Sequence, residues 1–234
     1  MIGTFGDSIS DTGLVRTENQ DSVLSAPERG LYVIADGMGG GEGGAAASRI
    51  LCEEMSGVAR AGEMAEAVGR AHRRIADYAA GRGYRTMGTT VAALKADGDR
   101  ATVLWVGDSR IYRLRAGKIE RLTDDHTVGN ELSRIAPGVA AGRLAERSHP
   151  LAHVLTRAVG VESTVKPDEL RTEIKPGDRF LLCSDGVHDL LTDEAIASLL
   201  AVPHTRQEAL QNLALAVREA GAHDNFSMIV VDAE

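Results

Sequence analysis

The chain has 234 residues, a length that fits one α/β domain, and we expect residues 1–234 to form a single domain. Its hydrophobic content of 43% is sufficient for a core. Its formal net charge of −8 argues against a nucleic-acid binder, which needs a basic face to meet phosphates. The N-terminal segment lacks the features of a signal peptide, and no stretch approaches the roughly 20 apolar residues of a membrane span. We therefore expect a cytoplasmic protein with no nucleic-acid and no membrane partner.

Apolar periodicity predicts strands and helices in separate blocks along the chain. The first block has three strands and then two helices, at 3–9, 22–24, 31–35, 44–60 and 63–81. A glycine-rich run at 39–44 predicts a turn between the third strand and the first helix. A predicted four-strand meander follows, with turn residues between its strands, at 89–95, 101–106, 110–115 and 118–122.

The pattern then becomes polar and irregular, and we interpret residues from about 128 to 150 as a small flap insertion on the surface. After it come two strands, two helices and a last strand, at 169–174, 179–184, 193–200, 205–220 and 226–231. Strands joined by short turns are antiparallel, and helices that come in pairs disfavour a doubly wound parallel sheet. We therefore predict an α+β fold, a four-layer α/β/β/α sandwich of two antiparallel sheets flanked by helix pairs. A dinucleotide-binding loop at 37–44 is disfavoured because Asp36, directly before it, would oppose a pyrophosphate.

Four aspartates lie at the ends of predicted buried strands. Asp36, Asp108 and Asp185 each follow such a strand, and Asp224 precedes one. Carboxylates that converged there would repel one another strongly unless a cation lay between them. The pattern therefore predicts a cage of oxygen ligands for hard divalent cations, Mg²⁺ or Mn²⁺.

Eight short motifs extend this pattern over most of the chain. They are VRTENQD at 15–21, DGMGG at 36–40, GTT at 88–90, GDSR at 107–110, DHT at 125–127, LTRAVG at 155–160, SDG at 184–186 and DN at 224–225. In this order they resemble the metal-dependent protein serine/threonine phosphatases of the PP2C type, and the DGMGG form and compact length resemble the bacterial branch. The resemblance implies hydrolysis of phosphoserine and phosphothreonine by direct attack of a metal-bridging hydroxide. It also implies phosphorylated proteins and a cognate Ser/Thr kinase as partners, and we expect a monomer.

The same resemblance implies roles for single residues. Asp36 would bridge two Mn²⁺ or Mg²⁺ ions, and the Gly37 carbonyl would bind one of them. Asp185 and Asp224 would hold the other ion, and Asp108 would help Asp185 to hold a third, weaker one. Two further residues complete the set: Asp21 would grip metal-bound waters, and Arg16 would clamp the substrate phosphoryl group, whose paired oxygens suit a guanidinium fork.

Two positions depart from better-known eukaryotic relatives. Met38 stands where those carry a histidine proposed as general acid, and a thioether cannot donate a proton. His126 and His188 are alternative donors, although a structural role fits each better. Gln20 stands where those relatives have glutamate, so it can orient a metal-bound water but adds no charge.

Two other functions remain open from the residues. One is a catalytically silent phosphoprotein-binding module on the same fold, which the retention of Asp36, Asp185 and Asp224 disfavours. The other is a metal hydrolase acting on nucleotides or phosphodiesters. An aromatic content of 3% disfavours it, because base stacking needs aromatic side chains.

Overall fold

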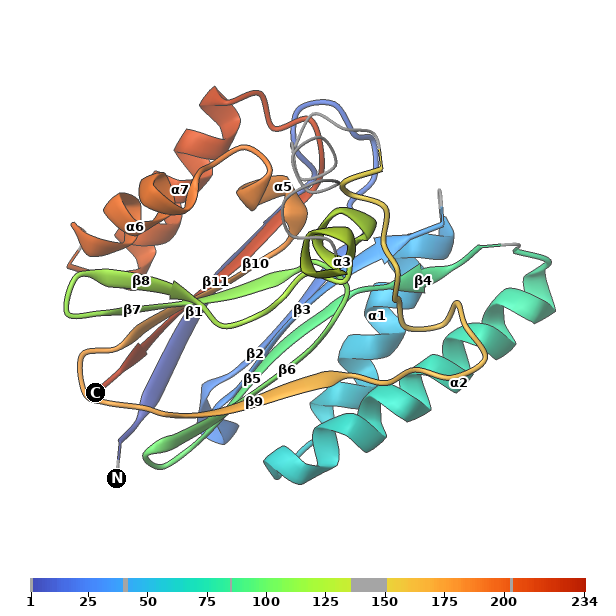
Figure 1. Ribbon diagram of the computed structural model, residues 1–234, viewed down its shortest axis with the longest axis horizontal. Helices are drawn as coiled ribbons and strands as arrows, with labels where there is room; N and C mark the ends of the chain where they lie inside the picture. Colours follow the sequence, from blue (N-terminus) through green and yellow to red (C-terminus); the bar gives the residue numbers. More distant parts are fainter. Residues whose placement is uncertain (1, 40–41, 85, 136–150, 203) are drawn as a thin grey trace.

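The structure is a computed structural model that describes residues 2–39, 42–84, 86–135, 151–202 and 204–234 (Figure 1). Two antiparallel sheets form its centre. The first has the strand order β1-β11-β10-β7-β8, with bounds Thr4–Asp11, Phe226–Ala233, Arg179–Cys183, Arg110–Arg115 and Lys118–Arg121. The second has the order β2-β3-β5-β6-β9, with bounds Asp21–Ala26, Leu31–Met38, Val91–Asp97, Arg100–Val106 and Asp168–Glu173. A short strand, β4 (Gly88–Thr89), pairs with the end of β3.

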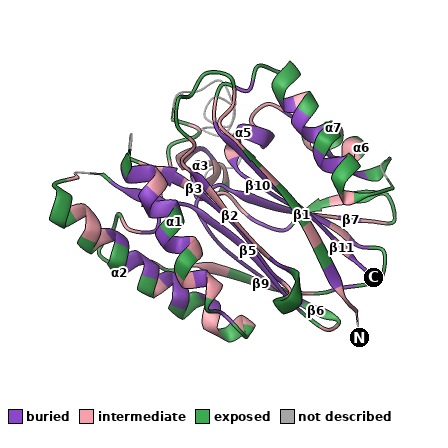
Figure 2. Ribbon diagram, turned by 180° about the vertical axis from the view of Figure 1, so that it is seen from behind, coloured by how far each residue is buried: buried purple, intermediate pink, exposed green. Residues whose placement is uncertain are grey.

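Helices cover the outer face of each sheet, so the predicted four-layer α+β sandwich is confirmed. The second sheet carries α1 (Glu42–Ser56) and α2 (Met64–Arg82), and the first carries α5 (Asp185–His188), α6 (Asp193–Ala201) and α7 (Arg206–Glu219). Figure 2 shows that the helices are buried on the side facing a sheet and exposed on the other. None of the helices in the described ranges is both long and apolar enough to cross a membrane.

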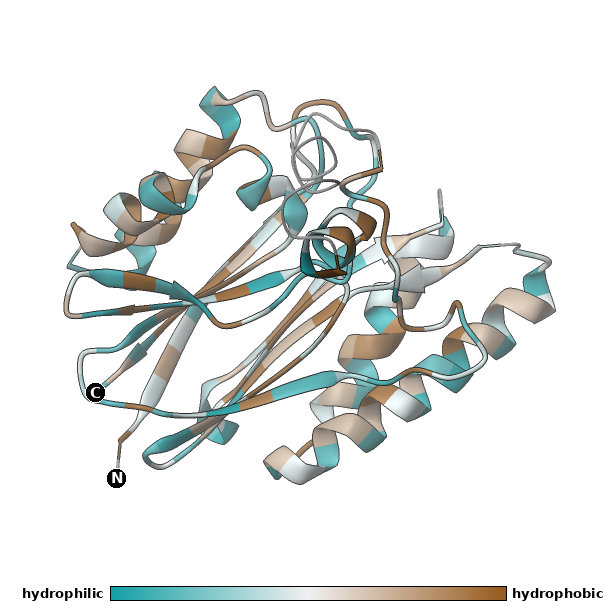
Figure 3. Ribbon diagram, viewed as in Figure 1, coloured by the Kyte–Doolittle hydropathy of each residue, from teal (hydrophilic) through white to brown (hydrophobic). Residues whose placement is uncertain are grey.

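Three hydrophobic clusters hold the layers together. One lies under α1 and α2 and includes Leu51 and Ile75, and another lies under α6 and α7 and includes Leu213. The third fills the space between the sheets and includes Tyr32 and Phe180, both fully buried. Apolar residues gather on these inner faces, whereas the edge strand β9 is largely hydrophilic (Figure 3). The close-packed clusters therefore hold the two sheets and their helices in fixed relative positions.

The helix starts have the expected chemistry. Thr205 accepts a hydrogen bond from the N–H of Glu208 at 3.1 Å, and Glu208 accepts one from the N–H of Thr205 at 3.3 Å. This capping box satisfies backbone N–H groups that the first turn of α7 leaves unpaired. Thr192 caps α6 through the N–H of Ala195.

The predicted four-strand meander is wrong, because the chain changes sheets in its middle. Strand β6 belongs to the second sheet and β7 to the first, so residues 107–109 connect the two sheets instead of forming a hairpin. Gly107 has a positive φ of 98°, and a Cβ there would lie 2.6 Å from the Thr90 side chain. Only glycine makes this crossing without strain. The crossing carries Asp108 from the strand end into the space between the sheets.

Three smaller expectations also differ from the structure. Asp36 lies within β3, which continues to Met38 because β4 pairs with its last residues. Gly43 and Gly44 belong to α1, so the predicted turn at 39–44 is shorter than expected. In the flap segment the structure has a helix, α3 (Val128–Ile135), and the rest of the segment from 136 to 150 lies outside the described residues.

Candidate metal centre

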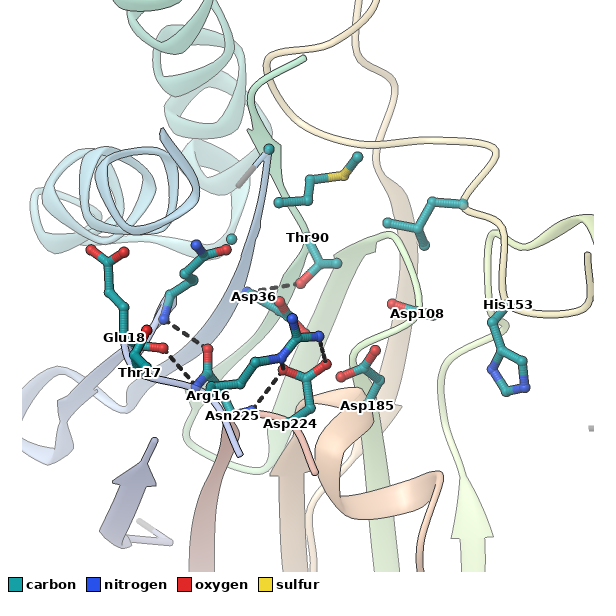
Figure 4. A pocket seen from close by; sticks show the side chains of 15 residues that line it. Arg16, Thr17, Glu18, Asp36, Thr90, Asp108, His153, Asp185, Asp224 and Asn225 are labelled. Carbon is teal, nitrogen blue, oxygen red and sulfur yellow. Dashed lines mark hydrogen bonds and ion pairs between the residues drawn. The ribbon is translucent and has the colours of Figure 1, made fainter. Parts of the chain in front are cut away.

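A cavity of about 490 Å³ receives side chains from both sheets. Its walls come from the β1–β2 loop, β3, the crossing before β7, α5 and the residues before β11 (Figure 4). The predicted site residues that line it are Arg16, Gln20, Asp36, Gly37, Asp108, Asp185 and Asp224. The structure thus brings together residues that are up to 208 positions apart in the sequence.

Asp36 and Asp185 are two carboxyls that line the same cavity and interact electrostatically. Removal from bulk water raises the pKa of both, and for Asp36 the nearby Asp21, Asp185 and Asp108 raise it further. A divalent cation would stabilise carboxylates that are brought together in this way.

The backbone of Asp36 is held from one side by a pair of threonines. Its N–H donates to Thr90 Oγ1 at 3.0 Å, and its carbonyl accepts from Thr90 N–H at 2.8 Å and from Thr89 Oγ1 at 2.9 Å. The next residue, Gly37, has no room for a side chain, since a Cβ would lie 2.1 Å from the Gly44 carbonyl oxygen. The position of Asp36 is therefore rigid.

Asp21 lies opposite Asp36 in the β2–β3 register and is only 8% exposed. Its Oδ2 accepts a hydrogen bond from Ser184 Oγ at 2.8 Å, whereas its buried Oδ1 has no hydrogen-bond partner. Burial raises the pKa of Asp21 to about 7, although hydrogen bonds from Ser227 and Ser184 oppose the change. A buried carboxylate oxygen without a partner is the kind of atom that a cation or its water shell would satisfy.

Asp108 is 6% exposed, and burial together with the charges of Asp185, Asp125 and Asp189 raises its pKa well above the usual value. Its carbonyl oxygen lies 3.0 Å from His188 Nε2. It lines both the main cavity and a neighbouring cavity of about 250 Å³. The carboxyl is therefore shared between two spaces, as expected for a residue beside the central pair.

Arg16 and Asp224 form a two-point ion pair across the mouth of the cavity. Arg16 Nε donates to Asp224 Oδ1 at 2.9 Å, and one of its terminal nitrogens donates to Asp224 Oδ2 at 2.7 Å (Figure 4). The pair raises the pKa of Arg16, which stays charged. Asn225 fixes the loop that carries Arg16, because its side chain bonds to the backbone of Thr12, Glu18 and Gln20.

The oxygen atoms of the site suit a hard divalent cation, but their side chains are not arranged around a single ion position. Among the described residues, no three Asp, Glu, His or Cys side chains are arranged as ligands of a single ion. Asp224, for example, is paired with Arg16.

Three residues of the site were not predicted. Thr90 and Asn225 lie inside short motifs, but nothing in the sequence indicates that they hold Asp36 and the Arg16 loop. His153 also lines the cavity, and it lies in no motif. The two histidines considered as proton donors are buried: His126 is 3% exposed and accepts from Gly107 N–H, and His188 is 2% exposed.

Comparison with known proteins defines the class to which this fold and site belong. The sequence profile of the family Protein phosphatase 2C matches residues 6–216, so the chain belongs to that family. Solved structures agree in fold. PppA, described as a key regulatory component of T6SS in Pseudomonas aeruginosa, superposes with a TM-score of 0.89 and 34% identity over 100% of both chains. The catalytic domain of PstP in complex with two manganese ions superposes with a TM-score of 0.86 and 30% identity, over 100% of this chain and 99% of that one.

Curated relatives carry matching names. The serine/threonine protein phosphatase PstP of Mycobacterium tuberculosis is 35% identical over 242 residues, which cover 95% of this chain but 44% of that protein. The chain therefore spans less than half of the length of that relative. The protein phosphatase PhpP of Streptococcus pneumoniae is 28% identical over 240 residues, covering 95% of each protein.

Proposed function

We propose that the chain is a bacterial Mn²⁺- or Mg²⁺-dependent protein phosphatase that hydrolyses phosphoserine and phosphothreonine. The single observation that carries the proposal is that Asp36, Asp185, Asp108 and Asp224 all line one cavity with an arginine at its mouth. Family membership and a relative that contains two manganese ions support the same function. Phosphorylated proteins would be the substrates, and a Ser/Thr kinase would act in opposition.

In this proposal Asp36, Asp185, Asp224 and the carbonyl of Gly37 would together be the ligands of two metal ions. Asp108 together with Asp185 would hold a third, weaker ion. The bound ions would supply the positive charge that activates an attacking water and offsets charge on the phosphoryl oxygens. Asp21, with its unpartnered Oδ1, would accept hydrogen bonds from water around the ions.

Arg16 would bind the phosphoryl group by exchanging partners. Its guanidinium is 57% exposed at the cavity mouth and already makes the two parallel hydrogen bonds that a phosphate accepts. Asp224 would release Arg16 if it served as a metal ligand, and the guanidinium fork would then be available to two phosphoryl oxygens. Arg16 and Asp224 would thus change roles together, from a mutual ion pair to a substrate clamp and a metal ligand.

The test is hydrolysis of a phosphothreonine peptide and of p-nitrophenyl phosphate with Mn²⁺, Mg²⁺, Ca²⁺ or a chelator. We expect both substrates to be cleaved with Mn²⁺ and neither with the chelator. Binding of the phosphopeptide without turnover would indicate the silent binding module instead. Cleavage of nucleotides or phosphodiesters in preference to the phosphopeptide would indicate the other hydrolase class.

A further inference from the structure

The loop that carries Arg16 has no hydrophobic anchor. It runs from residue 12 to residue 20, between β1 and β2, and none of these residues is buried. Its two aliphatic residues, Leu14 and Val15, are 65% and 66% exposed. The position of the loop therefore depends on hydrogen bonds to the rest of the protein.

Asn225 supplies three of these hydrogen bonds. Its Nδ2 donates to the carbonyl oxygens of Thr12 and Glu18, both at 2.9 Å, and its Oδ1 accepts from the N–H of Gln20 at 2.9 Å. Asn225 is 6% exposed, and Figure 4 shows it beside Arg16. One buried amide therefore joins the two sides of the loop, across the segment that holds Arg16.

The turn that contains Asn225 is itself tightly packed. A Cβ on Gly186, in α5, would lie 2.0 Å from the Asn225 carbonyl oxygen, so the backbones of α5 and of this turn are in close contact. A Cβ on Gly13 would lie 2.2 Å from the Asp224 carbonyl oxygen, so the loop lies just as closely on the other side of the turn. Asn225 is thus a fixed point against which the loop is docked.

A second contact, the ion pair with Asp224, holds the Arg16 side chain directly. In the proposed function Asp224 would become a metal ligand, and this contact would then be lost. The side-chain bonds of Asn225 go to the loop backbone and involve neither the guanidinium nor the Asp224 carboxylate. They can therefore hold the loop in place after Asp224 has released Arg16.

Resting on the phosphatase function proposed above, we propose that Asn225 is the positioning residue for phosphate binding by Arg16. It holds the loop so that the guanidinium stays at the cavity mouth when Asp224 no longer pairs with it. A guanidinium makes two parallel hydrogen bonds to a phosphate only in a narrow range of orientations. Without Asn225, Arg16 keeps its charge but loses this orientation. Phosphate binding should therefore weaken while the ion site stays intact.

The test measures how inorganic phosphate inhibits hydrolysis of p-nitrophenyl phosphate at saturating Mn²⁺. Asn225→Ala should raise the Ki of phosphate and the KM about 5- to 50-fold, part of the effect of losing a charged hydrogen bond, with kcat within a few-fold of wild type. In an Arg16→Ala background it should add almost nothing, because Asn225 acts through Arg16. Gly13→Ala, whose Cβ would hold the loop off the turn, should show the same pattern.

Two control variants separate this role from a general loss of stability. Thr205→Ala removes the cap of α7, and Asn212→Ala replaces an exposed asparagine of the same helix. Both should leave the Ki of phosphate and kcat unchanged. Mn²⁺ binding to Asn225→Ala, measured by calorimetry, should be no weaker than to the wild type. Circular dichroism checks the fold of each variant, and Gly13→Ala decides the question if Asn225→Ala does not fold.

An unchanged Ki would overturn the role of Asn225 while leaving the phosphatase function in place. Losses that add to those of Arg16→Ala would overturn it too, because Asn225 would then act on something other than Arg16. Weaker Mn²⁺ binding would place its effect at the ion site and would have the same consequence. A wild-type protein inactive on both p-nitrophenyl phosphate and the phosphopeptide would refute the proposed function itself, and the role of Asn225 with it.

Discussion

Replacing Asp21 by asparagine should stabilise the metal-free protein at alkaline pH. The carboxyl is 8% exposed, has one oxygen without a partner and faces Asp36 across the strand pair. Its pKa is raised from 3.8 to about 7. A group with a raised carboxyl pKa contributes stability while it is protonated, and that stability is lost as pH rises from about 4 through about 7. Asparagine has nearly the same shape and never ionises.

The size of the effect follows from the two pKa values. A difference of about 3 pH units corresponds to on the order of 4 kcal/mol at pH 8, using about 1.4 kcal/mol per unit. Proton sharing with neighbouring carboxyls relieves part of this, so we expect about 2–4 kcal/mol. For a chain of this length that is a rise in Tm of roughly 4–16 °C.

The assay is thermal unfolding of wild type and Asp21→Asn in chelator at pH 4 and pH 8. The advantage should be large at pH 8 and nearly absent at pH 4. Asp178→Asn is the matched control, because two hydrogen bonds from Arg115 at 2.6 Å lower the pKa of that buried carboxylate against the effect of burial. Its replacement should destabilise the protein at pH 8. Equal Tm values for wild type and Asp21→Asn at pH 8, or the same advantage at both pH values, would refute the reasoning.

Three further outcomes are expected. Asp36→Asn should lower turnover at least about 10³-fold, because the transition state loses several kcal/mol of stabilisation. Asp97→Asn, at an exposed position, is the control and should leave turnover unchanged. Phosphopeptide kinetics measure the activity of both variants, and circular dichroism measures their fold. Arg16→Ala should raise KM about 10- to 100-fold, since it removes a group that binds the phosphate. It should also tighten Mn²⁺ binding a few-fold, because Arg16 competes with the ion for Asp224. Weaker Mn²⁺ binding in calorimetry would contradict this. Asp108→Asn should still bind the two central ions and should lose only part of the turnover. If its Mn²⁺ stoichiometry and its rate both equal those of the wild type, Asp108 has no role beyond the crossing between the sheets.

The sequence patterns of single segments predicted the four layers of the fold and the aspartates at the ends of buried strands, because each of these features depends on the residues of one segment. The ends of buried strands placed Asp185 and Asp224 next to the site, and paired helices indicated the four layers. The change of sheet at Gly107 was not predictable from its turn residues, since a hairpin and a crossing use the same small polar sequence. The pairing of Arg16 with Asp224, and the placing of His153 near Asp189, join distant segments and are properties of the tertiary structure alone.

The pairing of the first strand with the last has a consequence for biosynthesis. Thr4 on β1 pairs with Ala233 on β11, so β1 has no partner until the ribosome has made almost the whole described chain. At about 5–20 residues per second this wait lasts on the order of 10–50 s. The second sheet, β2 to β9, can assemble earlier. Asp224 and the β11 strand reach Arg16 and β1 only at the end, so a nascent chain carries no complete site until then.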